Sequence, residues 1–180
     1  MISLNVLLTL FILLFALIGA MRGWAKELLV TFSVILAMFS LTVLETYVPF
    51  FKETIQTSQP TSVFFIKGGI LALLVFAGYQ TPKIPKLVES GRFIRHIVQD
   101  TLLGFILGGL NGFLLFGTLW YYLHVAGYPF SFVSAPDALT QTGQAALRWI
   151  GYLPPEWLMT TPTIFIAVAV CFIFVLVVFI

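Results

Sequence analysis

Five long apolar runs constrain the fold of this chain more than any other feature of its 180 residues. They occupy residues 2–20, 28–44, 63–79, 101–126 and 163–180. A transmembrane helix needs about 20 mainly apolar residues, and a spanning segment must satisfy its own backbone hydrogen bonds. The sequence therefore predicts an all-α, polytopic integral membrane protein with five spans.

The composition leaves little material for a soluble domain, because 60% of the residues are hydrophobic and 9% are charged. The mean hydropathy is +1.06, whereas soluble domains carry about 25% charged residues. A net charge of +2 is too small to indicate a nucleic-acid partner. Nucleophile elbows, metal-ligand clusters and phosphate loops are absent from the sequence, so we expect no enzyme and no cofactor.

The distribution of Lys and Arg predicts the orientation of the chain. Arg22 and Lys26 follow the first run and nothing basic precedes it, which favours a retained helix over a cleaved signal peptide. Alternate connections are rich in cations: Arg22, Lys26, Lys83, Lys86, Arg92 and Arg95 fall on one side, and Lys52 and Arg148 on the other. The positive-inside rule predicts an outer N-terminus and an inner C-terminus.

Two connecting segments have helical periodicity of their own. Residues 84–99 predict an interfacial helix whose cations, Lys86, Arg92 and Arg95, face anionic lipid together with Lys83, which directly precedes it. An ordinary connecting helix that obeys the positive-inside rule is the alternative. The outer segment predicts a short helix capped by Ser134 or Asp137, with Trp149 as a headgroup-level anchor. Pro154 and Pro155 are expected to stop this helix and redirect the chain into the last run.

The fourth run contains the most specific spacing in the sequence, because Gly104, Gly108 and Gly112 lie four residues apart. This pattern places the glycines on one helix face, where a second helix can approach closely in lipid. The partner is either another helix of this chain, or a second copy, or a different membrane protein.

A few isolated side chains require separate interpretation. Lys67 is a charge within the third run, and we expect it to snorkel to the outer headgroups or to pair with Glu45. Cys171 is a lone cysteine in the last run and is expected to pack as a small apolar residue. His96 and His124 lie at opposite ends of the fourth run, too far apart to share a metal.

Two motifs carry a resemblance to a known family. The first is GAMRGWAKEL at residues 19–28, and the second is Asp100 followed by the three glycines. Together they resemble the turn and the fourth-helix entry of the colicin V production protein (CvpA) family of bacterial membrane proteins. The matching positions are Gly19, Arg22, Gly23, Lys26, Glu27, Asp100, Gly104, Gly108 and Gly112. Asn111 stands where that family usually has a basic residue.

The resemblance implies a four-helix membrane core over residues 1–126 in the bacterial inner membrane. An outer connection, 127–162, and an added C-terminal span, 163–180, follow it. The family is associated with colicin export and maintenance of the cell envelope, without an assigned reaction. We also expect Arg22 or Lys26 to pair with Asp100, which would fasten the first turn to the glycine helix.

Three functions are compatible with these features. The first is a non-enzymatic scaffold or export protein of the colicin V production type. The alternative is an accessory subunit whose helices dock within a larger respiratory or photosynthetic membrane complex. A small transporter comes third, because so few polar groups are available to line an aqueous path. The expected partners are the lipid bilayer and other membrane helices, or a second copy of the chain.

Overall fold

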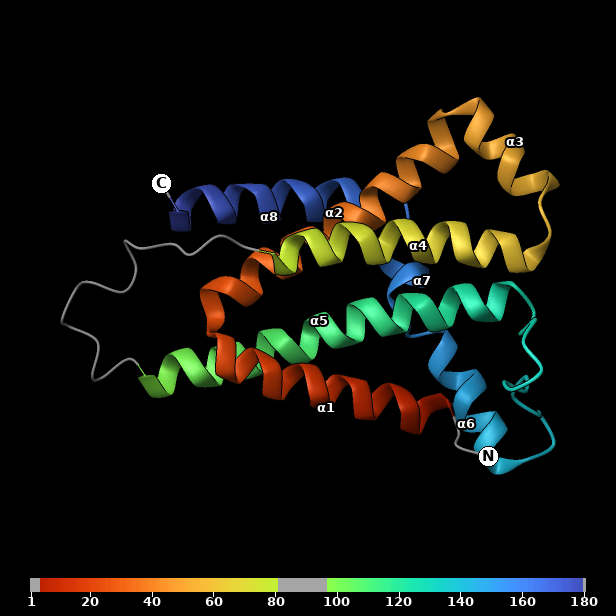
Figure 1. Ribbon diagram of the computed structural model, residues 1–180, viewed down its shortest axis with the longest axis horizontal. Coiled ribbons are helices and arrows are strands. Elements are labelled where there is room, and N and C mark those ends of the chain that lie inside the picture. The colour runs from red at the N-terminus through yellow and green to blue at the C-terminus, as the bar shows by residue number, and fades with distance from the viewer. Residues whose placement is uncertain (1–3, 81–96, 180) are drawn as a thin grey trace.

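A computed structural model describes residues 4–80 and 97–179, and these residues form helices joined by turns without any strand. The helices are α1 (Leu4–Arg22), α2 (Trp24–Tyr47), α3 (Pro49–Thr57), α4 (Pro60–Tyr79), α5 (Ile97–Val125), α6 (Gln141–Ile150), α7 (Pro154–Leu158) and α8 (Thr163–Phe179) (Figure 1). The predicted all-helical class is confirmed for this part of the chain.

Four helices, α1, α2, α4 and α5, are long and apolar enough to cross a membrane. The last predicted run forms one continuous helix, α8, of 17 residues. In the structure α8 follows α6 and α7 after a bend of 67°, so α6 to α8 together form a broken helix that begins outside the apolar run. The bend arises where the Thr160–Thr163 turn separates α7 from α8, with Thr160 donating a hydrogen bond to Thr163.

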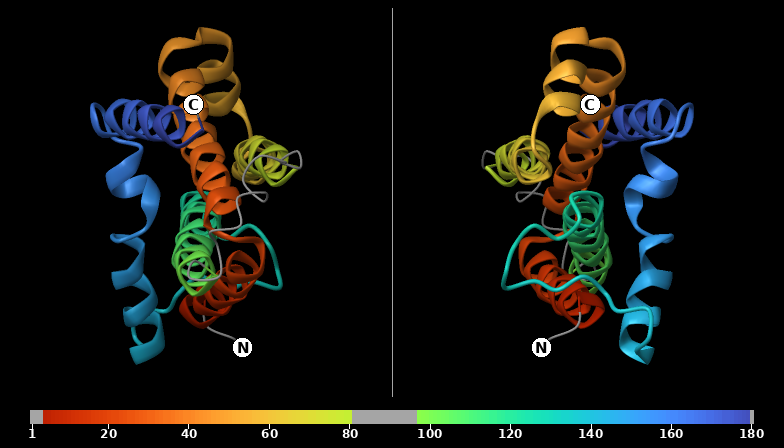
Figure 2. Two further views of the ribbon diagram at one scale, coloured as in Figure 1. Left: turned by 90° about the vertical axis from the view of Figure 1, so that its left-hand side faces the viewer. Right: turned by 90° about the vertical axis from the view of Figure 1, so that its right-hand side faces the viewer.

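The order of helices in space differs from their order in the chain. Figure 2 shows α5 lying between α1 and α2, and α2 lying between α4 and α8. The turn at residues 19–28 does not fold the first two helices into a hairpin. They are joined through a single residue, Gly23, but they splay apart: α1 packs chiefly on α5, and α2 packs on both α4 and α5. Gly23 permits the sharp break because its φ is +86°.

The glycines of α5 pack closely against another helix, and their partner is α1 of the same chain. Gly104 and Gly108 face Gly19, and Gly112 faces Ile12 and Phe15. A Cβ atom placed on Gly108 would lie 2.9 Å from the Cα of Gly19 and would overlap the carbonyl oxygen of Phe15. The backbones of α1 and α5 are therefore in direct contact. In lipid the hydrophobic effect does not bring helices together, so the dispersion attraction of this close contact is what holds the pair.

Two apolar clusters fill the remaining interior. The larger joins α2, α4 and α5 to α7 and α8, and includes Val34, Met38, Leu41, Leu71 and Leu114. The smaller holds α6 against the first half of α1 and the second half of α5, through residues including Leu8, Trp120, Tyr128, Ala146 and Ile150. The bundle thus has a core on each side of α5.

The connecting segments contain several departures from the sequence predictions. The connection between the second and third apolar runs, residues 45–62, contains a helix that the sequence did not predict, α3, which begins at Pro49. Neither Ser134 nor Asp137 caps α6; Thr140 does, accepting a hydrogen bond from the Gly143 N–H at 3.1 Å.

The two prolines were also interpreted wrongly. They begin α7 instead of ending α6, because proline suits the first turn of a helix, where its missing N–H leaves no hydrogen bond unmade. Pro154 packs on Gly117, where an added Cβ would lie 2.8 Å from the proline Cδ. The predicted basic interfacial helix with Lys83, Lys86, Arg92 and Arg95 falls almost entirely outside the described residues.

Gly108→Ala should separate α1 from α5 and lower the free energy of unfolding by about 1–3 kcal/mol, the usual effect of overpacking. Gly69→Ala is the matched control, since a Cβ at Gly69 of α4 meets no atom within 4 Å. Unfolding of the purified protein in mixed micelles measures both variants. Equal stability of the two variants would contradict the backbone contact described here.

Candidate functional site

A buried polar cluster joins the start of α2 to the middle of α5. We define it as Arg22, Glu27, Thr31 and Asn111. The side chains of Glu27 and Asn111 are fully buried, although charged and amide groups are costly to place in a membrane interior. Such groups persist there only when they satisfy one another, so their partners decide what the cluster does.

Each oxygen of the Glu27 carboxylate has a partner. Arg22 Nη1 lies 2.6 Å from Oε1 in an ion pair, and Asn111 Nδ2 donates to Oε2 at 2.9 Å. Asn111 Oδ1 in turn accepts a hydrogen bond from the Thr31 hydroxyl at 2.7 Å. The network is closed on itself, and this is the arrangement in which buried polar groups rigidify a fold.

The guanidinium of Arg22 extends the cluster to α4. It lies 4.4 Å from the centroid of the Tyr79 ring and donates to the Tyr79 carbonyl oxygen at 3.3 Å. That carbonyl belongs to the last turn of α4, where a cation is favoured by the helix dipole. One arginine therefore links α1, α2 and α4, while Asn111 adds α5.

Asp100 does not make the expected ion pair with Arg22 or Lys26. Its Oδ1 accepts a hydrogen bond from the Trp24 backbone N–H at 3.0 Å, so it caps the start of α2 from another helix. A Cβ at Gly23 would lie 2.7 Å from Asp100 Oδ2, and the glycine leaves room for the carboxylate. Arg22 turns instead to Glu27, which is buried and nearer, and Lys26 is exposed.

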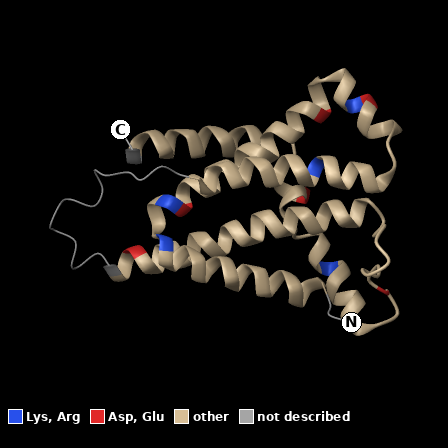
Figure 3. Cartoon of the chain, viewed as in Figure 1, with Lys and Arg blue, Asp and Glu red and all other residues tan. Residues whose placement is uncertain are grey.

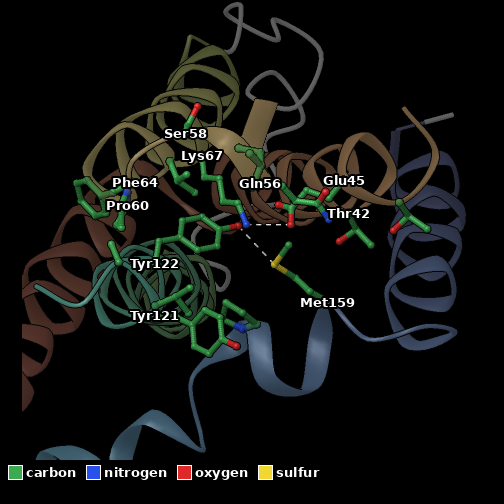
Figure 4. Close-up of a pocket in the computed structure, with 16 residues that line it drawn as sticks. Thr42, Glu45, Gln56, Ser58, Pro60, Phe64, Lys67, Tyr121, Tyr122 and Met159 are labelled. Atoms are coloured by element: carbon green, nitrogen blue, oxygen red, sulfur yellow. Dashed lines mark hydrogen bonds and ion pairs between the residues drawn. The ribbon is translucent and has the colours of Figure 1, made fainter. Parts of the chain in front are cut away.

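A second polar site lies at the opposite end of the bundle. A partly open cavity of about 620 Å³ lies among the end of α2, helix α3, the start of α4, the end of α5 and α7 (Figure 4). Its lining includes Thr42, Glu45, Gln56, Lys67, Tyr122 and Met159. Figure 3 shows that charged residues gather toward the two ends of the bundle, while α8 carries none.

Lys67 and Glu45 form the ion pair that the sequence suggested, with Nζ 2.9 Å from Oε2. Lys67 is deeper than expected, because α4 begins at Pro60 and the lysine lies about 10 Å of helix rise inside it. Its ammonium also lies 5.5 Å from the Tyr122 ring centroid. The Tyr122 hydroxyl donates to the sulfur of Met159 at 3.5 Å, which is a weak acceptor.

The other sequence candidates that the structure describes form no reactive constellation, and His96 lies outside the described residues. His124 Nδ1 lies 3.3 Å from the Tyr128 hydroxyl, within an aromatic group that includes Trp120. Among the described residues, no three His, Cys, Asp or Glu side chains come close enough to hold a metal ion. Cys171 is a free, half-buried thiol on α8.

Sequence reasoning missed Asn111 and Thr31 as members of the buried polar cluster, and Tyr122 as a wall of the cavity. Asn111 carried a usable signal, because an amide in the middle of an apolar span needs a polar partner on a neighbouring helix. Thr31 and Tyr122 carried none, since both residues are common in membrane helices without such a role. Comparison with protein families, characterised proteins and solved structures finds no match to this chain.

Arg22→Met should leave the Glu27 carboxylate buried without its cation and lower the free energy of unfolding by about 3–5 kcal/mol. The double variant Arg22→Met/Glu27→Gln should lose less than this single variant, because a neutral amide is easier to bury. Unfolding in mixed micelles measures both.

Lys26→Met is the matched control, since this cation is exposed one residue from Glu27, and its change should stay within about 0.5 kcal/mol. A double variant that is less stable than Arg22→Met would show that charge neutralisation is not what Arg22 supplies.

Proposed function

We propose that this chain is a non-enzymatic, multi-pass protein of the bacterial inner membrane, of the colicin V production type, that serves as a scaffold for export or envelope maintenance. The observation that carries the proposal is the meeting of its two motifs. Gly19 faces Gly104 and Gly108, and Asp100 caps the helix that starts after Gly23. Motifs separated by about 80 residues thus form one contact, which supports reading them as parts of one family pattern.

A scaffold role is supported by how the motif charges are used. Arg22, Glu27 and Asp100 are engaged in contacts that position helices, and the glycines bring backbones together. These interactions make a rigid platform, as closed polar networks do. Such a platform presents its outer faces to lipid and to partners with little internal rearrangement.

A specific observation favours the accessory-subunit alternative. Helix α8 packs on the bundle through α2 and α7 and leaves much of its surface open, including Ile166, Val170, Phe172, Ile173 and Val177. A broad apolar face can be covered by lipid alone or by a helix of another subunit. The two functions therefore predict different co-purifying proteins when the chain is extracted from the membrane with detergent.

Gentle detergent extraction followed by native sizing and mass spectrometry tests the choice. The scaffold proposal expects a homogeneous monomer or homo-oligomer of the 20.1 kDa chain. Stoichiometric co-purification with a respiratory or photosynthetic complex would contradict it and favour the accessory subunit.

The proposed orientation has the N-terminus outside and the C-terminus inside. Cysteines introduced at Lys52 of α3 and Arg148 of α6 should react with an impermeant maleimide on intact cells, because both positions are exposed and belong to the outer connections. A cysteine at Lys26 should react only after permeabilisation. A Cys171→Ala background removes the native thiol, and the opposite labelling pattern would reverse the orientation.

A further inference from the structure

The cavity at the end of the bundle contains an incomplete polar pair. Glu45 uses Oε2 for Lys67, whereas its Oε1 is buried and has no hydrogen-bond partner among the described residues. Lys67 has three N–H donors, and Glu45 accepts one of them. The pair therefore combines an unpaired acceptor with a partly used ammonium, and both residues line the cavity, with the Lys67 side chain 13% exposed and that of Glu45 30%.

The opposite charges of Lys67 and Glu45 restrict which ligands can occupy the cavity. A simple anion that approached Lys67 would also meet the Glu45 carboxylate, and a simple cation that approached Glu45 would meet the ammonium. A zwitterion escapes both conflicts when its own cation carries N–H groups and lies a few ångströms from its anionic oxygen. Its N–H would satisfy Glu45 Oε1, and its anion would take the remaining Lys67 donors.

The walls of the cavity supply a second restriction. Ile55, Val63, Phe64 and Val125 give it an apolar side, next to the polar residues Thr42 and Gln56. The cavity lies where α2 ends, α4 begins and α5 ends, which is the level of the headgroups if these helices span the bilayer. Its volume of about 620 Å³ exceeds the need of a bound ion and is in the range of small-molecule sites.

We propose that this cavity binds a phosphoethanolamine group, with its ammonium on Glu45 Oε1 and its phosphate on Lys67 Nζ. The group is supplied either by the headgroup of phosphatidylethanolamine or by a water-soluble phosphoethanolamine ester. The apolar wall of Phe64 and Val125 contacts the glycerol and first acyl carbons of the lipid form. Figure 4 shows Lys67 and Glu45 meeting inside the cavity beside Tyr122.

Headgroup chemistry tests the proposal on the unaltered protein. Native mass spectrometry of the full chain, titrated with three lipids of identical acyl chains, should find phosphatidylethanolamine bound about 10-fold tighter than phosphatidylcholine. The choline headgroup keeps both charges but has no N–H for Glu45, and 10-fold is what a charge-assisted hydrogen bond contributes. Phosphatidylglycerol, an anion without a cation, should bind no better than phosphatidylcholine. Equal binding of the first two lipids, or tightest binding of phosphatidylglycerol, would overturn the proposal.

Variants locate the binding in the cavity. Lys67→Met and Glu45→Gln should each remove the preference for phosphatidylethanolamine, whereas Lys52→Met and Glu53→Gln, on the exposed face of α3, should retain it. Thermal unfolding of each sample separates lost binding from lost folding, and a preference that survives in folded Lys67→Met overturns the assignment.

Competition by glycerophosphoethanolamine identifies the source. Displacement of the lipid at comparable concentrations would assign the site to the soluble ester, and displacement only at large excess would assign it to the lipid.

Discussion

The contact between the backbones of α1 and α5 sets the geometry on which the rest of the bundle depends. Lipid gives no hydrophobic drive between helices, so close approach must supply the attraction. Gly19, Gly104 and Gly108 allow an approach that any side chain would prevent. Because α5 is held so closely along α1, the flank of its glycine face is turned toward α2, and Asn111, which lies seven residues after Gly104 on that flank, reaches Glu27.

The buried polar cluster makes that arrangement specific. Apolar surfaces of α2 and α5 could slide past one another with small changes in dispersion energy, whereas a shift of one helical turn, about 5.4 Å, would separate Asn111 from Glu27 and Thr31 and leave buried polar groups without partners. A closed network in a medium of low dielectric therefore penalises wrong registers more strongly than it stabilises the right one. Asp100, which caps α2 from α5, fixes the same register at the end of the helices.

Local pattern allowed the spans and the glycine face to be predicted, because length, apolarity and four-residue spacing are properties of a single helix. The Lys67–Glu45 ion pair could also be predicted from the sequence, because each charge is costly to place in lipid and pairing lowers that cost. The partner of Arg22 could not be predicted from the sequence, because the choice between Asp100 and Glu27 depends on how α2 crosses α5. Helix α3 was hidden by its polar composition, although Pro49 marks a helix start.

The charged groups at the two ends of the bundle have different roles. Those at the start of α2 stabilise the fold, whereas those in the cavity are available to bind a ligand. In the cluster at the start of α2, both carboxylate oxygens of Glu27 are paired and an arginine fits them through a rigid, planar group. In the cavity, a lysine with a flexible stem meets a carboxylate that retains an unpaired oxygen, and space adjoins both. The closed cluster gains nothing from a ligand, since any donor or acceptor would have to displace a partner already in place. The open pair gains from one, because a group with matching charges completes its hydrogen bonds without breaking the ion pair.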